Sequence, residues 1–311
     1  MKNILIVLLG PTGVGKTDIS ISLAKRFACE IISADSRQFF IEMKIGTAVP
    51  SDYQLHAINH HFIRFKSVED YYSSSLFERE VINLLPSLFS KNNFVLMAGG
   101  SGMYIDAVCS GIDDIPDVDT EIREKYINKY KEEGIEGLRA ALKILDPDHY
   151  SKVDLKNHKR IMRALEICET TGRPYSSYLI KNKREREFGI LKIGLERSRE
   201  DLYNRINMRV DAMIETGLEE EARQLLKFRN LNAMNCVGYR EFFDFFDGKI
   251  TRDKAIELIK RNSRRYAKRQ ITWWGKDQDI KWFHPDHVLE ITEYIKSVSL
   301  TSELYPSDPS T

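Results

Sequence analysis

The sequence lacks the closely spaced cysteines that zinc sites and disulfide frameworks require. Its four cysteines, Cys29, Cys109, Cys168 and Cys236, lie far apart among 311 residues, and no CxxC pair occurs. This spacing argues against both kinds of site and is typical of proteins that fold in a reducing compartment. A cytoplasmic protein is therefore expected.

Long apolar runs are missing as well. The opening segment MKNILIVLLG resembles the start of a signal peptide, but its apolar run from Ile4 to Leu9 has only six residues and ends in a Gly-Pro turn instead of a small-residue cleavage site. A membrane-spanning helix needs roughly 18 or more apolar residues, and no later segment approaches that length. The run is therefore predicted to be a buried strand, and no membrane association is expected.

An excess of charge of one sign is also absent, since 47 basic and 46 acidic residues give a net charge of +1. Affinity for an acidic polymer must therefore come from local clusters. The densest is RNSRRYAKRQITWWGK, residues 261–276, where a helix would present two basic rows on one broad face. These rows are Lys260, Arg264 and Lys268, and Arg261, Arg265 and Arg269, with Tyr266, Trp273 and Trp274 nearby as stacking or packing groups.

A second basic cluster, KNHKRIMRALE, places Lys156, Lys159, Arg160 and Arg163 on one side of a predicted helix. Either cluster alone can be a solvated surface. Two separate basic surfaces in one chain favour a large polyanion, and an unpaired base of RNA is the favoured target.

Short apolar runs alternate with helical segments over the first hundred residues, which predicts βαβ units and a parallel sheet. Near Gly111 the pattern changes to charged, helix-rich sequence, and GILKIGLE at 189–196 returns as a strand before further helices. The predicted fold is α/β: a P-loop parallel-sheet core with an inserted all-helical domain and a helical C-terminal region. We expect a discontinuous core at 1–112 and 188–300, a helical insertion at 113–187, and a disordered tail at 301–311.

The segment GPTGVGKT fills the spacing G-x-x-x-x-G-K-T with Gly10, Gly15, Lys16 and Thr17, between a predicted strand and a predicted helix. Backbone amides of such a loop surround phosphate oxygens at a helix N-terminus, and the lysine neutralises a further oxygen. The Thr17 hydroxyl is the candidate ligand of a Mg²⁺ ion. We therefore predict a phosphate-binding loop.

A nucleotide hydrolase of this class would also carry an acidic residue at the end of an apolar strand, to hold the metal. Here NFVLMAGG ends in Gly99 and Gly100, and the acid Asp35 follows the second predicted strand instead. Asp35 and the loop should meet at the carboxyl edge of the sheet. This arrangement suggests that Asp35 handles a proton; the alternative is that it only caps the next helix.

Taken together, GPTGVGKT, DSRQFF, AGGSGMYI, RVDAMIETGLEEE, VGYREF and RRYAKRQITWW make the chain resemble the bacterial tRNA dimethylallyltransferase family from Gly10 to about Trp274. The resemblance implies transfer of a dimethylallyl group from dimethylallyl diphosphate to the N6 amine of the adenine 3′ of the anticodon. It also implies Mg²⁺ dependence and a channel in which the adenine meets the allyl diphosphate from the opposite end. The expected partners are tRNA and dimethylallyl diphosphate, and a monomer is expected.

The resemblance implies that Asp35 is the general base and that Ser101 occupies the position of a family hydroxyl. With Lys16 and Thr17 these form the expected catalytic group. The residues expected at the diphosphate are Gly10, Pro11, Thr12, Gly13, Val14, Gly15, Lys16 and Thr17, with Arg205 and Arg209 as an added clamp or, alternatively, ordinary surface charges of a helix.

The remaining implied contacts are to tRNA, from family segments and from the basic helix. Phe40 and Ser263 differ from the usual family residues, as does VDLKNHKR in the insertion. The residues expected to contact tRNA are Asp35, Ser36, Arg37, Gln38, Ser101, Arg123, Lys159, Arg160, Ile161, Met162, Arg163, Asn235, Cys236, Val237, Gly238, Tyr239, Arg240, Arg264, Arg265, Lys268, Arg269 and Gln270.

Two other functions fit part of the pattern. A P-loop kinase of a small metabolite would use Asp35 to activate a hydroxyl, but it leaves the missing metal-binding acid and the basic surface unexplained. An RNA-binding module with a vestigial loop would leave Asp35 without a role.

Overall fold

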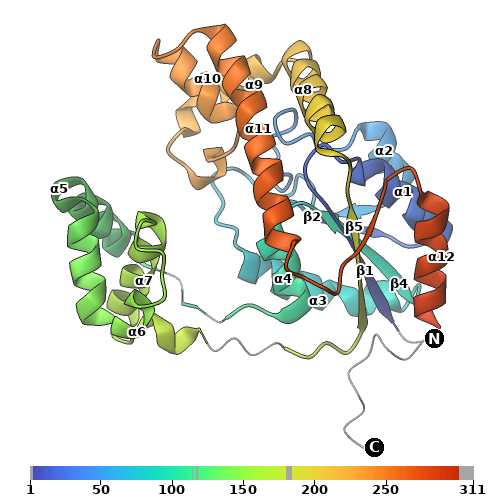
Figure 1. Ribbon diagram of the computed structural model, residues 1–311, viewed down its shortest axis with the longest axis horizontal. Helices are drawn as coiled ribbons and strands as arrows, with labels where there is room; N and C mark the ends of the chain where they lie inside the picture. The colour runs from blue at the N-terminus through green and yellow to red at the C-terminus, as the bar shows by residue number, and fades with distance from the viewer. Residues whose placement is uncertain (1–2, 114, 117, 180–183, 301–311) are drawn as a thin grey trace, which may run out of the picture. The chain divides into compact units, whose positions relative to one another are not determined.

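Figure 1 shows a computed structural model of the chain, which describes residues 3–113, 115–116, 118–179 and 184–300. The chain divides into two compact units: the core unit, Met1–Ser110 with Glu185–Thr311, and the inserted unit, Gly111–Arg184. The predicted disordered tail at 301–311 lies outside the described residues.

The core unit is built on a parallel sheet of six strands in the order β3-β2-β4-β1-β5-β6. Every residue of β1 is buried, which is typical of a parallel strand covered on both faces. The two edge strands β3 and β6 were not predicted from the sequence. The strands are β1 (Ile4–Leu9), β2 (Ile31–Ala34), β3 (His60–His61), β4 (Phe94–Gly99), β5 (Gly189–Leu195) and β6 (Lys281–Phe283).

The alternation of side chains along β1 divides the core between the two faces of the sheet. Leu5, Val7 and Leu9 pack with α3 (Ser74–Phe89) and α4 (Gly102–Ser110) on one face. Their neighbours Ile4, Ile6 and Leu8 pack with helices on the other face, which are α1 (Lys16–Phe27) and α12 (Val288–Ser299). The predicted sheet with flanking helices is therefore confirmed.

The C-terminal part of the core unit is helical, as predicted, and it has a third hydrophobic cluster of its own. The long helix α11 (Arg252–Trp274) joins all three clusters, because Ile259 lies in the third, Ala267 in the second and Trp274 in the first. This helix is thereby fixed across the carboxyl edge of the sheet (Figure 1). The other helices of this unit are α2 (Asp52–Ala57), α8 (Arg199–Glu215), α9 (Leu218–Gln224) and α10 (Tyr239–Phe246), with short 3₁₀ turns at Leu226–Phe228 and Asn232–Met234.

The inserted unit is helical in its described residues, which confirms the predicted class of the insertion. A small core that includes Leu138, Leu142 and Leu165 holds α5 against α7. The helix α5 is interrupted at Gly134, whose φ of 67° favours glycine. The helices are α5 (Thr120–Leu145), α6 (Pro147–Tyr150) and α7 (His158–Thr171), followed by a 3₁₀ turn at Tyr175–Tyr178. Within the described ranges of both units, no helix combines the length and apolarity needed to cross a bilayer.

Candidate active site

The register of the sheet brings two predicted site segments together. Gly99 at the end of β4 pairs with Leu9 of β1 on one side and with Ala34 of β2 on the other. The next residues of those two strands, Gly10 and Asp35, therefore leave the same edge of the sheet. A Cβ atom on Gly99 would lie 2.1 Å from the Ala34 carbonyl oxygen, so this close approach requires glycine. The phosphate loop and Asp35 share one edge, as the sequence predicted.

The phosphate loop is held in shape by its own lysine. Gly13 and Gly15 have φ angles of 83° and 108°, which lets the backbone turn sharply before α1 begins at Lys16. Lys16 Nζ donates to the carbonyl oxygens of Gly10 at 2.7 Å and Pro11 at 2.9 Å. Burial lowers the pKa of Lys16 to about 7, the carboxylate of Asp35 opposes this change, and Arg209 adds to it.

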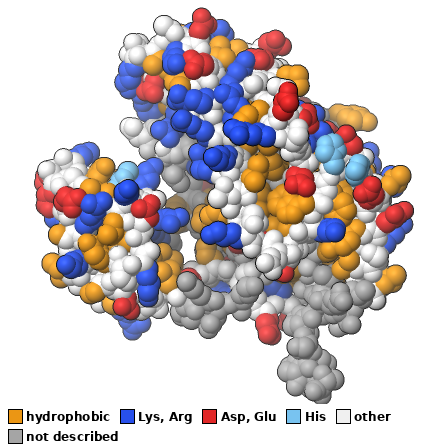
Figure 2. Space-filling view, in the orientation of Figure 1, with side chains coloured by type: hydrophobic (Ala, Val, Ile, Leu, Met, Phe, Trp, Pro, Cys, Tyr) orange, Lys and Arg blue, Asp and Glu red, His pale blue; other side chains and the backbone are white. Residues whose placement is uncertain are grey.

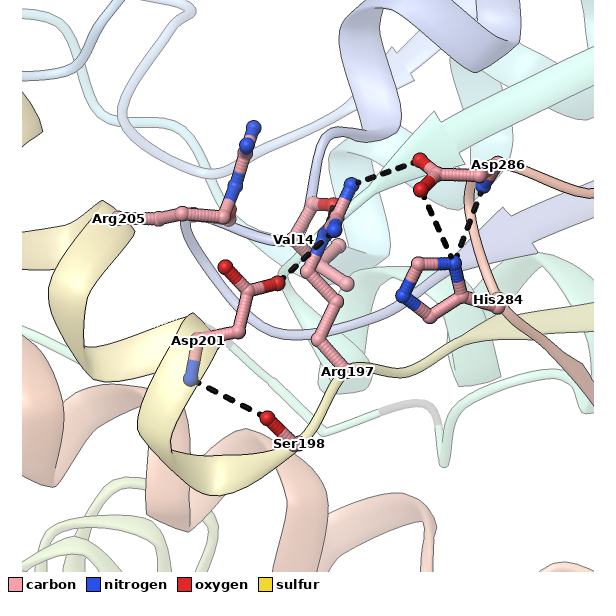
Figure 3. A network of polar contacts seen from close by, with 8 residues as sticks. Val14, Arg197, Ser198, Asp201, Arg205, His284 and Asp286 are labelled. Carbon is pink, nitrogen blue, oxygen red and sulfur yellow. Dashed lines mark hydrogen bonds and ion pairs between the residues drawn. The ribbon is translucent and has the colours of Figure 1, made fainter.

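Two arginines bind carbonyl groups of the loop from outside. Arg205 Nε donates to the Gly13 oxygen, and Arg197 Nε donates to the Val14 oxygen, each at 3.0 Å. Figure 3 shows Arg197 between the loop and the acids Asp201 and Asp286, to which it donates at 2.9 and 3.3 Å. The two arginines bind carbonyl oxygens, so they do not compete with a phosphate for the N–H groups of the loop. No sequence motif pointed to Arg197.

Gln270 connects the phosphate loop to the end of β4. Its side chain is buried, with 6% exposure. Its Oε1 accepts from Thr12 N at 2.8 Å, and its Nε2 donates to the Gly100 oxygen at 2.7 Å. The amide therefore ties the phosphate loop to the end of β4, and its hydrogen-bonding groups are used within the protein.

Asp35 begins a turn that a buried serine supports. Its Oδ1 accepts from Arg37 N at 3.0 Å, and no hydrogen bond to Oδ2 is found among the described residues. Ser101 Oγ accepts from Ser36 N at 2.9 Å and donates to Ser36 Oγ at 3.0 Å. The Tyr266 hydroxyl also bonds Ser101, and burial raises the pKa of that tyrosine. Ser101 thus positions the turn, and one oxygen of Asp35 stays available.

A cavity of about 970 Å³ in the core unit joins these segments. Residues of the phosphate loop, the turn after β2, α8, the segment before α10, and α11 line it. The predicted residues that line this cavity are Thr12, Gly13, Gly15, Lys16, Thr17, Asp35, Ser36, Arg37, Gln38, Arg205, Arg209, Asn235, Cys236, Val237, Gly238, Arg240, Arg265, Arg269 and Gln270. The predicted residues of the core unit outside its lining are Gly10, Pro11, Val14, Ser101, Tyr239, Arg264 and Lys268.

One wall of the cavity is the loop 44–50, and a carboxylate of α9 holds it. Glu221 accepts from the backbone N–H groups of Lys44 at 2.9 Å, Ile45 at 2.7 Å and Gly46 at 2.9 Å. It also accepts from the Tyr239 hydroxyl at 2.7 Å. Tyr239 is fully buried: its ring packs in the core and its hydroxyl orients Glu221.

Gln38 and Glu241 also support the walls of the cavity. Gln38 Nε2 donates to the carbonyl oxygens of Thr47 and Ala48, both at 3.1 Å, so its amide supports the same loop. Glu241 accepts from Gly238 N at 2.8 Å and from Asn262 Nδ2 at 2.7 Å. Sequence reasoning missed both acids, Glu221 and Glu241. On an amphipathic helix, the sequence around a carboxylate that binds backbone groups looks the same as the sequence around a solvent-exposed carboxylate.

Some basic side chains of α11 bind residues of α8, and others line the cavity. Arg264 Nη1 donates to Asn207 Oδ1 on α8 at 2.6 Å, and Lys260 pairs with Asp211 at 2.5 Å. Arg265 and Arg269 are exposed and line the cavity, while Lys268 is exposed outside its lining. Figure 2 shows Lys and Arg side chains gathered over the upper turns of α11 and the helices beside it. Only part of the predicted basic face is therefore free for a polyanion.

In the inserted unit, two of the predicted arginines, Arg123 and Arg163, lie near the buried carboxylate of Glu166. Glu166 lies 3.9 Å from Arg123 Nε of α5 and 3.7 Å from Arg163 Nη1 of α7. Lys159 and Arg160 are exposed on the first turn of α7, whereas Lys156 precedes that helix. Of the other residues predicted to contact tRNA, the Ile161 side chain is fully buried in the core of this unit, and Met162 packs partly against that core.

The described residues contain no group of three or more His, Cys, Asp or Glu side chains arranged to hold a metal ion. Thr17 and Asp35 both line a small recess of about 50 Å³ that opens beside Lys16. Oxygen donors of this kind suit Mg²⁺, which usually keeps several waters and binds protein through one or two groups plus substrate phosphates. The donor set therefore fits Mg²⁺ only together with a phosphate ligand.

A parallel sheet whose first strand leads into a phosphate loop at a helix N-terminus defines a P-loop protein. A family model described as IPP transferase matches residues 38–277. The chain belongs to the IPP transferase family. The resemblance found in the sequence is thereby confirmed.

Named relatives and solved structures agree. The chain is 52% identical to "tRNA dimethylallyltransferase 1" of Bacteroides thetaiotaomicron over 96% of each chain. It is also 52% identical to "tRNA dimethylallyltransferase" of Christiangramia forsetii, over 96% of this chain and 99% of that one. The full-length tRNA isopentenylpyrophosphate transferase of Bacillus halodurans is 34% identical, with a TM-score of 0.69 over 95% of this chain and 96% of that one. A eukaryotic dimethylallyltransferase acting on tRNA is 25% identical, with a TM-score of 0.78 over 99% and 81%.

Proposed function

We propose that this enzyme transfers the dimethylallyl group of dimethylallyl diphosphate to the N6 amine of the adenine directly 3′ of the anticodon in tRNA, and releases diphosphate. The names of its relatives support the reaction class. The observation that carries the proposal is that Lys16 of the phosphate loop and Asp35 line one cavity with exposed arginines of α11. The end of β4, in contrast, carries Gly99 and Gly100 and no acid that would hold a metal for nucleotide hydrolysis.

The diphosphate is the leaving group. As the allylic C–O bond breaks, its electron pair passes to the diphosphate oxygen, where negative charge develops. The loop amides and Lys16 bind this charge, and Arg209 adds a second cation whose pKa is lowered by burial and raised in part by Asp35. Cations removed from water interact strongly with developing charge, so each well-placed donor contributes several kcal/mol, on the order of 3.

Asp35 accepts the proton. The lone pair of an exocyclic adenine amine is delocalised into the ring, so attack on the allylic carbon requires removal of an N6 proton as the new C–N bond forms. The free oxygen of Asp35 is the acceptor in the cavity wall, and Arg37 N holds the other oxygen. A positioned base contributes about 10²- to 10⁴-fold in rate, which is less than the combined contribution of the groups at the diphosphate.

The Thr17 hydroxyl, together with the diphosphate and water, would hold a Mg²⁺ ion as a cofactor. This ion would supply neutralisation of the leaving group's charge. Thr17 lies at the start of α1, directly after Lys16, so both side chains serve the same phosphates.

The RNA is bound by basic groups of both units. In the core unit these are Arg265, Arg269 and Arg240, which are exposed and line the cavity; in the inserted unit they are Arg123 and the cations of the first turns of α7. We assign the domains 1–112 with 188–300 to catalysis and 113–187 to tRNA contact. A monomer acting on cytoplasmic tRNA is the proposed working state.

Incubation with Mg²⁺, an anticodon stem-loop RNA and either dimethylallyl diphosphate or ATP tests the proposal. With dimethylallyl diphosphate the RNA should gain the mass of one dimethylallyl group at the target adenine, and ATP should not be consumed. A matched control replaces that adenine by guanine. ATP consumption with a metabolite, or RNA binding without a mass gain, would each refute the proposed reaction.

Asp35→Asn and Asp52→Asn give a second matched pair. Asp52 is an exposed carboxylate of α2 outside the cavity lining, so its loss should leave turnover unchanged. Only the Asp35 variant should lose turnover.

A further inference from the structure

Trp273 is an exposed aromatic side chain that is nevertheless fixed in place. Half of its surface, 50%, is accessible, whereas the adjacent Trp274 is buried at 2%. Its indole Nε1 donates to Asp106 Oδ2 of α4 at 2.8 Å. The ring also lies against Gly102, where a Cβ atom would come within 2.5 Å of the indole. Asp106 and Gly102 therefore hold the indole in one orientation, with part of it facing solvent.

Trp273 continues the row of α11 side chains that lines the cavity. Arg265, Arg269 and Trp273 are spaced by four and are all exposed, so they follow one another along a single face of the helix. The two arginines line the cavity, and the tryptophan lies outside its lining. Four residues of α-helix advance about 6 Å. The indole therefore lies one helical turn beyond the cationic edge of the cavity.

The surroundings of the indole fit an unpaired nucleobase better than an apolar protein surface. Arg269 precedes the indole by one turn, and Lys276 is exposed just after it; the adjacent acid, Asp106, is bound to the indole N–H and interacts with Lys192. A flat aromatic ring flanked by cations is the combination that binds single-stranded nucleic acid, through base stacking and phosphate contacts. A side chain that is already fixed also loses little conformational entropy when a base stacks on it.

We propose that Trp273 is a stacking platform for an unpaired base of the RNA substrate, the neighbour of the nucleotide that enters the cavity. The inference rests on the proposed function for the identity of the polymer. Asp106 and Gly102 are positioning residues of this platform, because they orient the indole and do not touch the base. Stacking on Trp273 contributes affinity that does not depend on salt, in addition to the salt-dependent contacts of the arginines.

Binding of the anticodon stem-loop, without dimethylallyl diphosphate, tests the platform. Trp273→Leu keeps an apolar side chain but removes the flat ring, and it should weaken binding about tenfold, within the range for loss of one stacked base. The slope of log affinity against log salt should stay unchanged. Arg269→Ala should instead reduce that slope by about 0.7 to 0.9, the change expected for one lost phosphate contact.

Ile271→Ala is the matched control, since Ile271 is 44% exposed on the same helix and should bind RNA like the wild type. Trp273→Phe, which retains a ring, should bind RNA more tightly than the leucine variant. Stem-loops with 2-aminopurine at one loop position at a time report stacking directly. At a single position next to the target, fluorescence should be quenched by the wild type and restored in Trp273→Leu.

Unchanged RNA affinity and unchanged quenching in Trp273→Leu would refute the platform. A loss of affinity accompanied by a smaller slope of log affinity against log salt would also refute it, because it would indicate a lost phosphate contact. A concentration-dependent dimer that requires Trp273 would assign the indole to a contact between two copies and would also refute it. If Trp273→Leu melts at a lower temperature than the wild type, the test uses Trp273→Phe instead. The platform then requires that Trp273→Phe still quenches the base next to the target. The wild-type mass gain on RNA is measured separately: if it fails while quenching persists, the reaction is wrong and the platform stands.

Discussion

The lowered pKa of Lys16 makes phosphate binding depend on pH. Burial brings this pKa to about 7 in the ligand-free loop. A diphosphate in the loop places several negative charges beside the amine and stabilises its charged form, so binding raises the pKa. Below pH 7 the lysine already carries its proton. Above pH 7, binding must take up a proton, and the apparent affinity falls.

The size of this effect follows from the pKa. Affinity for inorganic diphosphate should fall about tenfold for each pH unit well above 7, and by about fiftyfold between pH 7 and pH 9, because only the protonated fraction of the lysine binds well. At pH 8 about 0.9 of a proton should be taken up by this group for each diphosphate bound.

Isothermal titration calorimetry with Mg²⁺ and inorganic diphosphate, in buffers of different ionisation enthalpy, measures both quantities. Lys16→Arg is the control, since a guanidinium stays charged throughout this range. Ionisation of the diphosphate affects both proteins equally, so the ratio of the two affinities isolates Lys16. A ratio that is constant from pH 6 to pH 9, with no extra proton uptake by the wild type, would refute the reasoning.

Three further predictions concern other properties of the site. Asp35→Asn should bind the stem-loop normally but lose about 10²- to 10⁴-fold in kcat; near-normal turnover would exclude the base role. Gln270→Ala leaves Thr12 N and the Gly100 oxygen without their partner, which should cost about 1–3 kcal/mol of stability and raise KM for dimethylallyl diphosphate; an unchanged melting temperature would contradict this. Relative to Lys16→Met, the wild type should gain stability as pH rises from 7 towards 10.5, because over that range the unfolded lysine keeps a proton that the folded one has lost; a stability difference between the two proteins that is independent of pH would contradict the buried charge.

Much of the fold was predictable because it depends on local patterns. The apolar run at Ile4 to Leu9, the loop spacing of Gly10 to Thr17 and the helical period that follows each specify a conformation over a few neighbouring residues. The short edge strand β6 (Lys281–Phe283) was not predicted, since three residues carry no periodic pattern and depend on pairing with β5.

The residues at the cavity were predictable where they follow a strand in the sheet. Asp35 and the phosphate loop meet because Ala34 and Leu9 both pair with Gly99, which the parallel arrangement implies. The roles of polar side chains on the helices were less predictable. Gln270 and Tyr239 were expected at the RNA, yet both are buried and bind protein groups.

The sequence by itself determined that a phosphate loop and a carboxylate would stand at one edge of a parallel sheet, since strand order and local spacing suffice for that. Tertiary structure alone decided which polar residues of the helices face the cavity and which bind other protein groups behind its walls. Glu221, for example, binds three N–H groups of the loop 44–46, over 170 residues away in the chain. Nothing in its own helix distinguishes such a carboxylate from a solvated one, because its role depends on which distant backbone groups the packing leaves without a partner.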